Sequence, residues 1–221
     1  MARIARIVIP GHPHHVTQRG VRSQDVFFSA QNRIEYLHLL SSQGSRHGVT
    51  FLAYCLMSNH IHLIAVPSEE KSLARAIGEA HRRYTFNVNS VQDVRGYLFQ
   101  GRFYSCPLDE RHLYAAVRYI ERNPVRAGLA QEPWDYTWSS AAWRVGLKDK
   151  DPLVKESLYL EEMDWREFLT KDTEKEMKDC LQKKVKTGRI CGNNDFVERA
   201  EELTGRILRF LPRGRPRLNN K

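Results

Sequence analysis

The chain has 221 residues and a mass of 25.8 kDa, with 41% hydrophobic and 28% charged residues and a formal net charge of +9. This length and composition exclude a disordered polymer and a membrane protein, and they allow one ordinary domain with a smaller appendage, or two domains. The excess of basic residues favours a phosphate-bearing partner, nucleic acid before anionic lipid.

Two further features bear on location. The longest stretch without Lys, Arg, Asp or Glu, residues 47–68, is long enough to span a bilayer. We do not expect a transmembrane helix there, because its interior carries Thr50, Ser58, Asn59, His60 and His62. The amino terminus has no apolar run of signal-peptide length and no small-residue cleavage site. We therefore expect a cytoplasmic location, associated with the nucleoid if the partner is DNA.

The cysteines show no paired two-residue spacing along the chain. They are Cys55, Cys106, Cys180 and Cys191. This spacing indicates neither a zinc knuckle nor a secreted disulfide framework. We interpret all of them as packing residues.

The amino-terminal part of the chain predicts a strand followed by a helix. β-Branched residues over 4–9 and 15–18, bounded by proline and glycine, favour an early strand. Apolar residues then recur at helical spacing after Ser29, a residue type suited to the N-cap, until Gly44 and Gly48. We expect the first helix to begin after Ser29 and to stop at these glycines.

The middle of the chain predicts a hairpin, two helices and a further short strand. This prediction rests on strand-forming residues, on apolar residues at helical spacing, and on a proline that ends the last helix. The expected elements are a hairpin over 49–57 and 59–66, a helix from Ser72, a strand over 103–106, and a helix from Asp109 as N-cap to the Asn123-Pro124 step.

The order strand, helix, strand, strand, helix, strand matches the split βαβ arrangement. We predict an α+β, ferredoxin-like fold, an antiparallel sheet with helices on one face, to which the third helix is added. After Trp134 the composition shifts toward tryptophan, serine and charge. We expect a main domain over 1–145, a helical extension over 146–205 with helices across 173–186 and 195–203, and a basic tail over 206–221.

Two histidines, His60 and His62, lie two residues apart in the strand predicted over 59–66. Side chains two residues apart leave the same face of a strand, so both imidazoles can bind one metal ion. A strand with one solvated face also alternates histidine with aliphatic residues. The spacing alone leaves both interpretations open.

The third predicted helix has an apolar face and an opposite face with Arg111, Arg118 and Arg122. Tyr119 and Asn123, four residues apart, fall together on one flank between these faces. A phenol oxygen there could attack a phosphate while an amide oxygen completes a metal site. The alternative is a boundary tyrosine with its hydroxyl in water and an asparagine that caps the helix end. This helix alone favours the alternative.

A tyrosine nucleophile would need a metal site close to it. A phenol has an ordinary pKa of about 10, so phosphoryl transfer at neutral pH needs a nearby cation. Two neutral imidazoles and an amide oxygen suit Mn²⁺ or Mg²⁺, with water and phosphate completing the coordination, whereas structural zinc prefers four protein ligands. An open coordination sphere of this kind favours catalysis.

Four sequence blocks resemble the single-tyrosine HUH transposases. They are HVTQRG at 15–20, MSNHIHL at 57–63, FQGRF at 99–103 and RYIERNPVRAGL at 118–129. With the basic extension, they resemble the REP-associated tyrosine transposases, a domesticated branch associated with short palindromic repeats in bacterial genomes. The resemblance covers about residues 3–145 and implies the HUH nuclease fold for that domain.

The resemblance implies a role for each matching residue. His60 and His62 would bind a divalent metal, Mg²⁺ or Mn²⁺, and Tyr119 would form a covalent 5′-phosphotyrosine bond with cleaved single-stranded DNA. Asn123 would be the third ligand, at a place where many relatives carry glutamine, and His112 is the other candidate for that position. The free 3′-hydroxyl can later attack the phosphotyrosine, so strand transfer needs no nucleotide cofactor.

Basic and aromatic residues around this site fit a DNA substrate, although any single arginine is more often a solvated surface residue. The candidates for phosphate contacts are Arg19, Arg22, Arg75, Arg82, Arg83, Arg102, Arg118, Arg122 and Arg126. Tyr97, Phe99 and Phe103 are candidates for stacking on a base, with the phenylalanines better suited to the core. In the tail, Arg213 and Arg215 lie in a motif that resembles an AT-hook; a disordered solubilising end is the alternative.

The sequence therefore predicts a metal-dependent DNA nicking and strand-transfer enzyme, acting as a monomer or homodimer. It would bind a DNA hairpin and cleave the adjacent single strand through Tyr119. One alternative is a domesticated protein that binds hairpins as an architectural or regulatory factor without cleavage. Another is a hydrolase of small phosphate esters, which would normally use additional Asp and Glu ligands.

Overall fold

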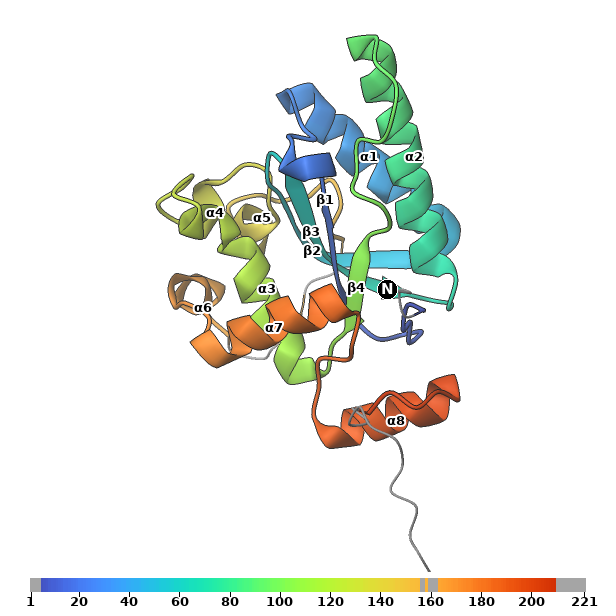
Figure 1. Ribbon diagram of the computed structural model, residues 1–221. Coiled ribbons are helices and arrows are strands. Elements are labelled where there is room, and N and C mark those ends of the chain that lie inside the picture. The colour runs from blue at the N-terminus through green and yellow to red at the C-terminus, as the bar shows by residue number, and fades with distance from the viewer. Residues whose placement is uncertain (1–4, 156–157, 159–162, 210–221) are drawn as a thin grey trace, which may run out of the picture.

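The computed structural model describes residues 5–155, 158 and 163–209 of the chain (Figure 1). At its centre is an antiparallel four-stranded sheet with the order β2-β3-β1-β4. The strands are β1 (His14–Arg19), β2 (Val49–Leu56), β3 (His60–Pro67) and β4 (Tyr104–Pro107). This order confirms the predicted α+β fold of the split βαβ type. The AT-hook-like motif with Arg213 and Arg215 lies outside the described residues.

The predicted longer helices are present, and short helical segments that the sequence did not predict accompany them. The helices are α1 (Ala30–His47), α2 (Ser72–Gln92), α3 (Glu110–Glu121), α4 (Asn123–Arg126), α5 (Ala141–Arg144), α6 (Trp165–Thr170), α7 (Lys175–Thr187) and α8 (Asn194–Thr204). Two 3₁₀ turns lie at Val21–Ser23 and Pro133–Asp135. None of the helices described in the structure has both the length and the apolar character that crossing a membrane requires.

Local capping explains where α1 and α3 begin. Ser29 accepts a hydrogen bond from the Asn32 amide, and Asp109 accepts one from the His112 amide, as N-caps do. Gly44 was expected to stop α1 but lies inside it, because this glycine lets the helix approach the Phe51 ring: a Cβ atom would lie 2.7 Å from that ring. α1 ends instead at Gly48, which adopts a left-handed φ of 65°.

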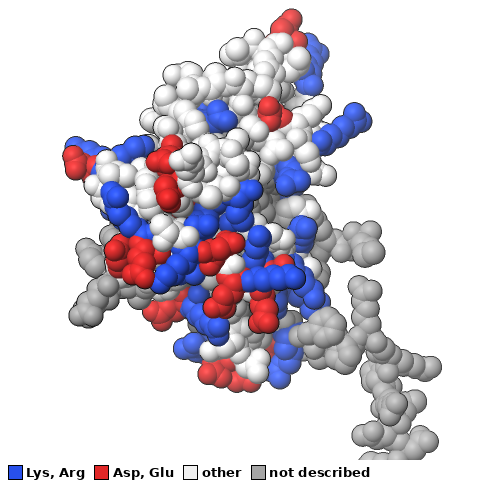
Figure 2. All heavy atoms as spheres, turned by 90° about the vertical axis from the view of Figure 1, so that its left-hand side faces the viewer, with Lys and Arg blue, Asp and Glu red and all other residues white. Residues whose placement is uncertain are grey.

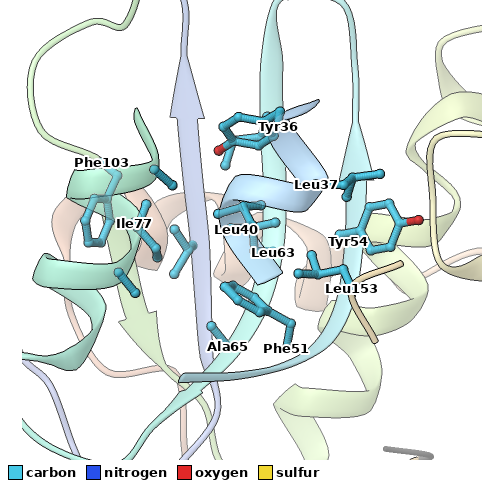
Figure 3. Packing of buried hydrophobic residues seen from close by; sticks show 14 of the residues in the cluster. Tyr36, Leu37, Leu40, Phe51, Tyr54, Leu63, Ala65, Ile77, Phe103 and Leu153 are labelled. Carbon is cyan, nitrogen blue, oxygen red and sulfur yellow. The ribbon is translucent and has the colours of Figure 1, made fainter. Parts of the chain in front are cut away.

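One face of the sheet packs against α1 and α2. Figure 3 shows the buried side chains of this cluster, including Tyr36 and Leu40 from α1, Leu63 from β3 and Ile77 from α2. Alternate residues of a strand point to the same face, so Leu63 and its neighbours two residues away supply this core. This layer is the part of the fold that the split βαβ pattern predicts.

The opposite face of the sheet is also covered, by α3 and α7 (Figure 1). The prediction that helices lie on one face is therefore incomplete. Ala53, Cys55 and Ile64 point away from the first core and join a second buried cluster with Ile120 of α3 and Leu181 of α7. A strand that is apolar on both sides must bury both sides, which is why helices cover both faces of the sheet.

The carboxy-terminal extension packs directly on the sheet. α7 contacts β4 and α3, and α8 covers Ile7 and Ile9 through Phe196 and Ala200. Residues 7–9 are therefore buried but do not belong to a strand, since β1 starts only at His14. Apolar, β-branched residues favour burial as much as pairing, which explains this difference from the predicted early strand. The division at residues 145 and 205 stays a prediction.

A buried ion pair joins the end of α3 to α5. Arg144 donates from Nε to both carboxylate oxygens of Glu121, at 2.8 and 2.9 Å, and the two side chains are 1% and 0% exposed. Ser140 also donates to this carboxylate, at 2.6 Å, and Arg144 donates to the Leu52 carbonyl at 2.6 Å. The carboxylate is thus held by several donors in the interior, although burial still raises the pKa of Glu121.

We expect Arg144→Met to lower the free energy of unfolding by about 3–5 kcal/mol, because it leaves the Glu121 carboxylate buried without its cation. Urea denaturation followed by circular dichroism measures this change. The matched control is the double variant Glu121→Leu with Arg144→Met, which removes both charges and should recover most of the loss. Equal destabilisation in the single and double variants would contradict this explanation.

Candidate active site

The two predicted metal-binding histidines lie next to each other on the α3 and α7 side of β3. Their ring centroids are 5.1 Å apart, with the rings nearly perpendicular. On the neighbouring strand β1, Arg19 pairs with His60 and Thr17 pairs with His62. Directly paired residues of an antiparallel sheet point to the same face, so the side chains of Arg19 and Thr17 flank the histidines.

α3 brings Tyr119 over this pair of histidines. The helix packs on β2 and β3 through residues such as Ala116 and Ile120, and the Tyr119 ring centroid lies 5.8 Å from that of His62. The tyrosine is 7% exposed, so its ring is more deeply buried than the flank position predicted from helical periodicity. Its hydroxyl accepts a hydrogen bond from Nε2 of Gln182, on α7, at 3.3 Å.

These side chains share one cavity with a volume of 610 Å³. Its wall includes His60, His62, Tyr119, Asn123, Arg19 and Lys186. Among the described residues that line it, none is acidic. The Tyr119 ring is packed, but the residue faces a polar, basic cavity rather than a dry interior. A cavity of this charge attracts phosphate.

Asn123 and Arg126 complete one end of the cavity. The Asn123 amide nitrogen lies 3.3 Å from Nε2 of His60, and its Oδ1 accepts a hydrogen bond from Arg126 at 3.1 Å. Arg126 also donates to the Tyr119 carbonyl at 2.8 Å, and its guanidinium carbon lies 4.2 Å from the centre of the Tyr119 ring. One arginine therefore links the tyrosine to the asparagine.

The Nδ1 atoms of both histidines are already engaged. Nδ1 of His60 lies 2.6 Å from Oδ1 of Asn59, a carbonyl oxygen that can only accept, so this nitrogen carries the proton. Nδ1 of His62 lies 2.9 Å from Nε2 of His15. When His62 donates in that contact, both histidines keep an Nε2 lone pair for a ligand.

Burial keeps these rings neutral. It lowers the pKa of His60 to about 4, with a smaller contribution from Arg19, and it lowers the pKa of His15 to about 3. It also lowers the pKa of His62 well below its ordinary value, helped by the neighbouring His15 and His60. Neutral imidazoles are metal ligands, so at neutral pH no proton has to leave before a cation binds.

The donor set fits the divalent cation that the sequence predicts. Two neutral imidazoles and an amide surround one region of the cavity, with the amide oxygen available by rotation of the Asn123 side chain. Since the described lining residues include no carboxylate, phosphate groups of a substrate would neutralise most of the cation's charge.

Comparison with known proteins bears directly on this arrangement. Residues 12–123, just over half of the chain, match the family described as Transposase IS200 like. The chain belongs to the IS200-like transposase family. No curated protein matches its sequence. The family match confirms the family predicted from the four sequence blocks, and it includes β1, the histidine pair and Tyr119.

One of two similar solved structures shows the same fold. A REP-associated tyrosine transposase bound to a REP hairpin superposes on this chain with a TM-score of 0.57 and 16% identity, covering 73% of this chain and 96% of the other. A proposed transposase from Deinococcus radiodurans superposes with a TM-score of 0.36 and 17% identity, covering 55% of this chain and 97% of the other.

The arginines predicted to contact DNA occupy several different places in the structure. Arg19 lines the cavity, and Arg22 and Arg102 are exposed. Arg82 and Arg83 are exposed on α2, on the opposite side of the sheet, where both pair with Glu79. Figure 2, which faces the side carrying α4 and α6, shows basic and acidic side chains interleaved rather than one continuous basic surface.

Two of these arginines hold α6 in place. The Arg118 guanidinium carbon lies 3.8 Å from the centre of the Phe168 ring. Arg122 donates to the carbonyls of Leu169 and Thr170, both at 2.6 Å. These contacts explain why the cationic face of α3, predicted to lie in solvent or on DNA, is partly covered by the chain itself.

The structure also locates the remaining candidates for base stacking and for the third metal ligand. Phe99 and Phe103 are buried in the core, whereas Tyr97 is exposed. His112 does not approach the histidine pair: its Nδ1 lies 2.6 Å from Asp109, and its ring faces Cys180. The alternative third ligand considered from the sequence is therefore wrong, because His112 lies at the start of α3 and Tyr119 is nearly two turns further along.

Several residues of the cavity were not predicted from the sequence, among them His15, Gln182 and Lys186. His15 contacts His62, Gln182 donates to the Tyr119 hydroxyl, and Lys186 lies on the same wall. The alternation of His15 with Thr17 and Arg19 along β1 is a signal that could have placed His15 on the histidine face. The positions of Gln182 and Lys186 depend on how α7 docks, for which the sequence holds no local signal.

Proposed function

We propose that this transposase is a divalent-metal-dependent endonuclease and strand transferase of single-stranded DNA, with Tyr119 as the nucleophile. The proposal rests on one observation: the tyrosine hydroxyl and the His60–His62 pair line the same cavity. Family membership supports it at the level of transposition. The solved structure with the same fold is described as bound to a REP hairpin, which supports a hairpin as the DNA element recognised here.

In the proposed step, the phenolic oxygen of Tyr119 forms a bond to a backbone phosphorus. The bond from that phosphorus to the 3′-oxygen of the preceding nucleotide breaks, and this oxygen leaves as a 3′-hydroxyl after taking up a proton. The product is a 5′-phosphotyrosine. Attack on it by a 3′-hydroxyl reverses the exchange, so cleavage and joining each replace one P–O bond with another.

His60, His62 and Asn123 would hold the divalent cation. When bound, Mg²⁺ or Mn²⁺ supplies positive charge that polarises the phosphate and stabilises the developing negative charge. The chain's own groups position the nucleophile. Arg126 holds the backbone at Tyr119 and Gln182 donates to its hydroxyl oxygen, so the phenol has a defined place before DNA enters.

Arg19 and Lys186 are the basic groups that we assign to the DNA strand near the cut. Both line the cavity, on β1 and α7 respectively, so they lie on two of its sides. Phosphate contacts of this kind supply affinity that falls with salt and carry no sequence preference. Specificity for a hairpin would come from other surfaces of the protein.

The direct test is covalent capture. The full chain is incubated with Mn²⁺ and an oligonucleotide that carries a hairpin followed by a single strand, labelled at its 3′ end. We expect labelled DNA to migrate with the protein under denaturing conditions, and chelation of the metal to prevent it. Tight hairpin binding with no adduct under any divalent metal would instead support the non-cleaving, architectural alternative.

We also propose that one chain cleaves in cis, as a monomer, because Tyr119 meets the histidines of its own chain. An equimolar mixture of Tyr119→Phe and His62→Ala chains should then form no adduct above the sum of the separate proteins, because neither chain holds a complete site. Gel analysis of the captured DNA measures this. Recovery of adduct in the mixture would show that the tyrosine helix acts on a second chain.

A further inference from the structure

A second cluster of metal-binding side chains lies outside the cavity. His112 of α3, Cys180 of α7 and Cys191, which follows α7, each offer one ligand atom, and these atoms all lie within 4.8 Å of one another. The two sulfur atoms are 3.5 Å apart. Cys191 is buried, and the other two residues are half-buried. These residues, which come from distant parts of the sequence, thus bring one nitrogen and two sulfur atoms close together.

Backbone hydrogen bonds hold the Cys191 segment against the end of β4. The Cys191 amide donates to the Pro107 carbonyl at 2.9 Å, and the Asp109 amide donates to the Cys191 carbonyl at 3.1 Å. Leu108 and Cys191 form a parallel bridge. The segment after α7 is therefore fixed in place by the chain that leads from β4 into α3, and the thiol is aimed into the cluster.

Asp109 orients the histidine. Its Oδ1 accepts a hydrogen bond from the His112 amide at 2.8 Å and lies 2.6 Å from Nδ1 of the same residue, while its Oδ2 accepts one from the Asn193 amide at 2.9 Å. Nδ1 of His112 is thus occupied, which leaves Nε2 as the ligand atom. A carboxylate behind a histidine is the usual outer shell of a zinc-binding imidazole.

Cys106 adds a buried thiol on the same face of the sheet. It is fully buried on β4, on the α3 and α7 face, but it is not among the residues whose ligand atoms lie within 4.8 Å of one another. A divalent metal deprotonates the thiols that coordinate it, so the two sulfur ligands of the cluster would be thiolates.

We propose that His112, Cys180 and Cys191 bind a zinc ion that ties α7 to α3 and to the end of β4. Thiolate and imidazole ligands favour zinc over the hard cations, and water would take the remaining position of a tetrahedral zinc ion. Zn²⁺ with two thiolates and a neutral imidazole carries no net charge, which suits burial.

The site would also stabilise the wall of the catalytic cavity. Gln182, which donates to the Tyr119 hydroxyl, lies two residues after Cys180 on α7, and Lys186 follows one turn later. A metal that holds α7 at Cys180 therefore keeps both cavity residues in register with α3. The spacing of the cysteines along the chain gives no sign of this cluster, because its members are close in space and not in sequence.

The test begins with the full chain, purified without a metal-binding tag. We expect an equimolar amount of zinc by elemental analysis and four titratable thiols after denaturation without reductant. Replacement by Co²⁺ should produce the intense ultraviolet charge-transfer band of cobalt–thiolate bonds. Wild-type protein that takes up no zinc or cobalt with thiolate character would overturn the proposal. So would loss of two of the four thiols, because a Cys180–Cys191 disulfide would then explain the cluster.

Variants separate this site from the catalytic one. Cys180→Ser and Cys191→Ser should each abolish the cobalt–thiolate band or lower zinc affinity by at least about 10-fold. Cys55→Ser, a buried thiol of β2 outside the cluster, serves as the matched control and should retain zinc. A variant with both His60 and His62 changed to Ala should also retain it. Zinc lost from this last variant and kept in the cysteine variants would assign the metal to the catalytic cavity and overturn the proposal.

Asp109→Asn tests the outer shell. Asparagine is as good an N-cap as aspartate, so α3 should persist, with unchanged far-ultraviolet circular dichroism. The loss of the carboxylate behind His112 should weaken zinc binding by about 10–100-fold, measured by competition with a chromogenic chelator. Unchanged zinc affinity would remove His112 from the ligand set.

Discussion

Tyr119→Phe is expected to abolish the covalent adduct with DNA and to lower cleavage by at least about 10³-fold, because it removes the oxygen that attacks the phosphate. The change should leave the fold intact. The aromatic ring keeps its packing against His15 and His62 and its contact with Arg126, and only the 3.3 Å hydrogen bond from Gln182 is lost. We expect the free energy of unfolding to change by less than about 1.5 kcal/mol.

The matched control is Tyr114→Phe. Tyr114 lies on the same helix, α3, but packs near Trp165 and does not line the cavity, so its variant should form the adduct at the wild-type rate. Adduct formation is measured with 3′-labelled DNA under denaturing conditions, and hairpin affinity is measured in parallel. An undiminished adduct in Tyr119→Phe would assign the nucleophile to another residue, even if hairpin affinity is normal.

Mild acid is expected to unfold the protein, because buried histidines must become charged. Burial lowers the pKa of His14 to about 4 and that of His81 to about 3, against an ordinary value of 6.5 in the unfolded chain. Between pH 6.5 and 4 the unfolded state therefore binds protons that the folded state does not. Stability is fully present above pH 6.5 and falls as the pH decreases through this window.

The expected loss is about 1.4 kcal/mol per pH unit for each histidine, so about 5 kcal/mol for the two between pH 6.5 and 4.5. This is comparable with the total stability of many domains. Both rings are engaged in the interior: His14 accepts a hydrogen bond from the Ile9 amide at 3.1 Å, and His81 lies 2.8 Å from the Tyr36 hydroxyl. Urea denaturation at a series of pH values measures the slope.

His81→Gln isolates one of these histidines. Glutamine keeps a polar partner for the Tyr36 hydroxyl but cannot titrate, so the variant should lose about 1.4 kcal/mol per pH unit of the slope between pH 6.5 and 4.5. His38→Gln, at an exposed position of α1, is the control and should keep the wild-type slope. A wild-type protein whose unfolding midpoint does not change over this pH range would contradict the argument.

The histidine pair shows what a local sequence pattern can predict and what it cannot. Two residues with period-two spacing in a strand point to one face, so the sequence predicted that His60 and His62 lie together. Their proximity to Tyr119 was an inference from chemistry and from the family resemblance. The structure brings these residues to one cavity because α3 packs on β2 and β3, which buries the apolar stripe predicted for that helix.

The arginines of α3 show a contact that a local sequence pattern could not predict. Helical periodicity correctly separated an apolar face of α3 from a basic one. It could not predict that α6 would fold back on Arg118 and Arg122, since that contact joins segments nearly fifty residues apart. Charge in a sequence indicates an attraction, but only the packed chain decides which basic groups remain available to a partner.

The sequence by itself determined the longer helices, the paired strands, the order of these elements and the family. Caps such as Ser29 and Asp109, strand alternation and the order of the elements are local properties, and these were enough for a split βαβ sheet. The tertiary structure alone decided that both faces are covered, that α7 closes the cavity with Gln182, and that Cys180 and Cys191 meet His112. These outcomes depend on which buried surfaces complement each other across long stretches of chain, and spacing along a sequence does not carry that information.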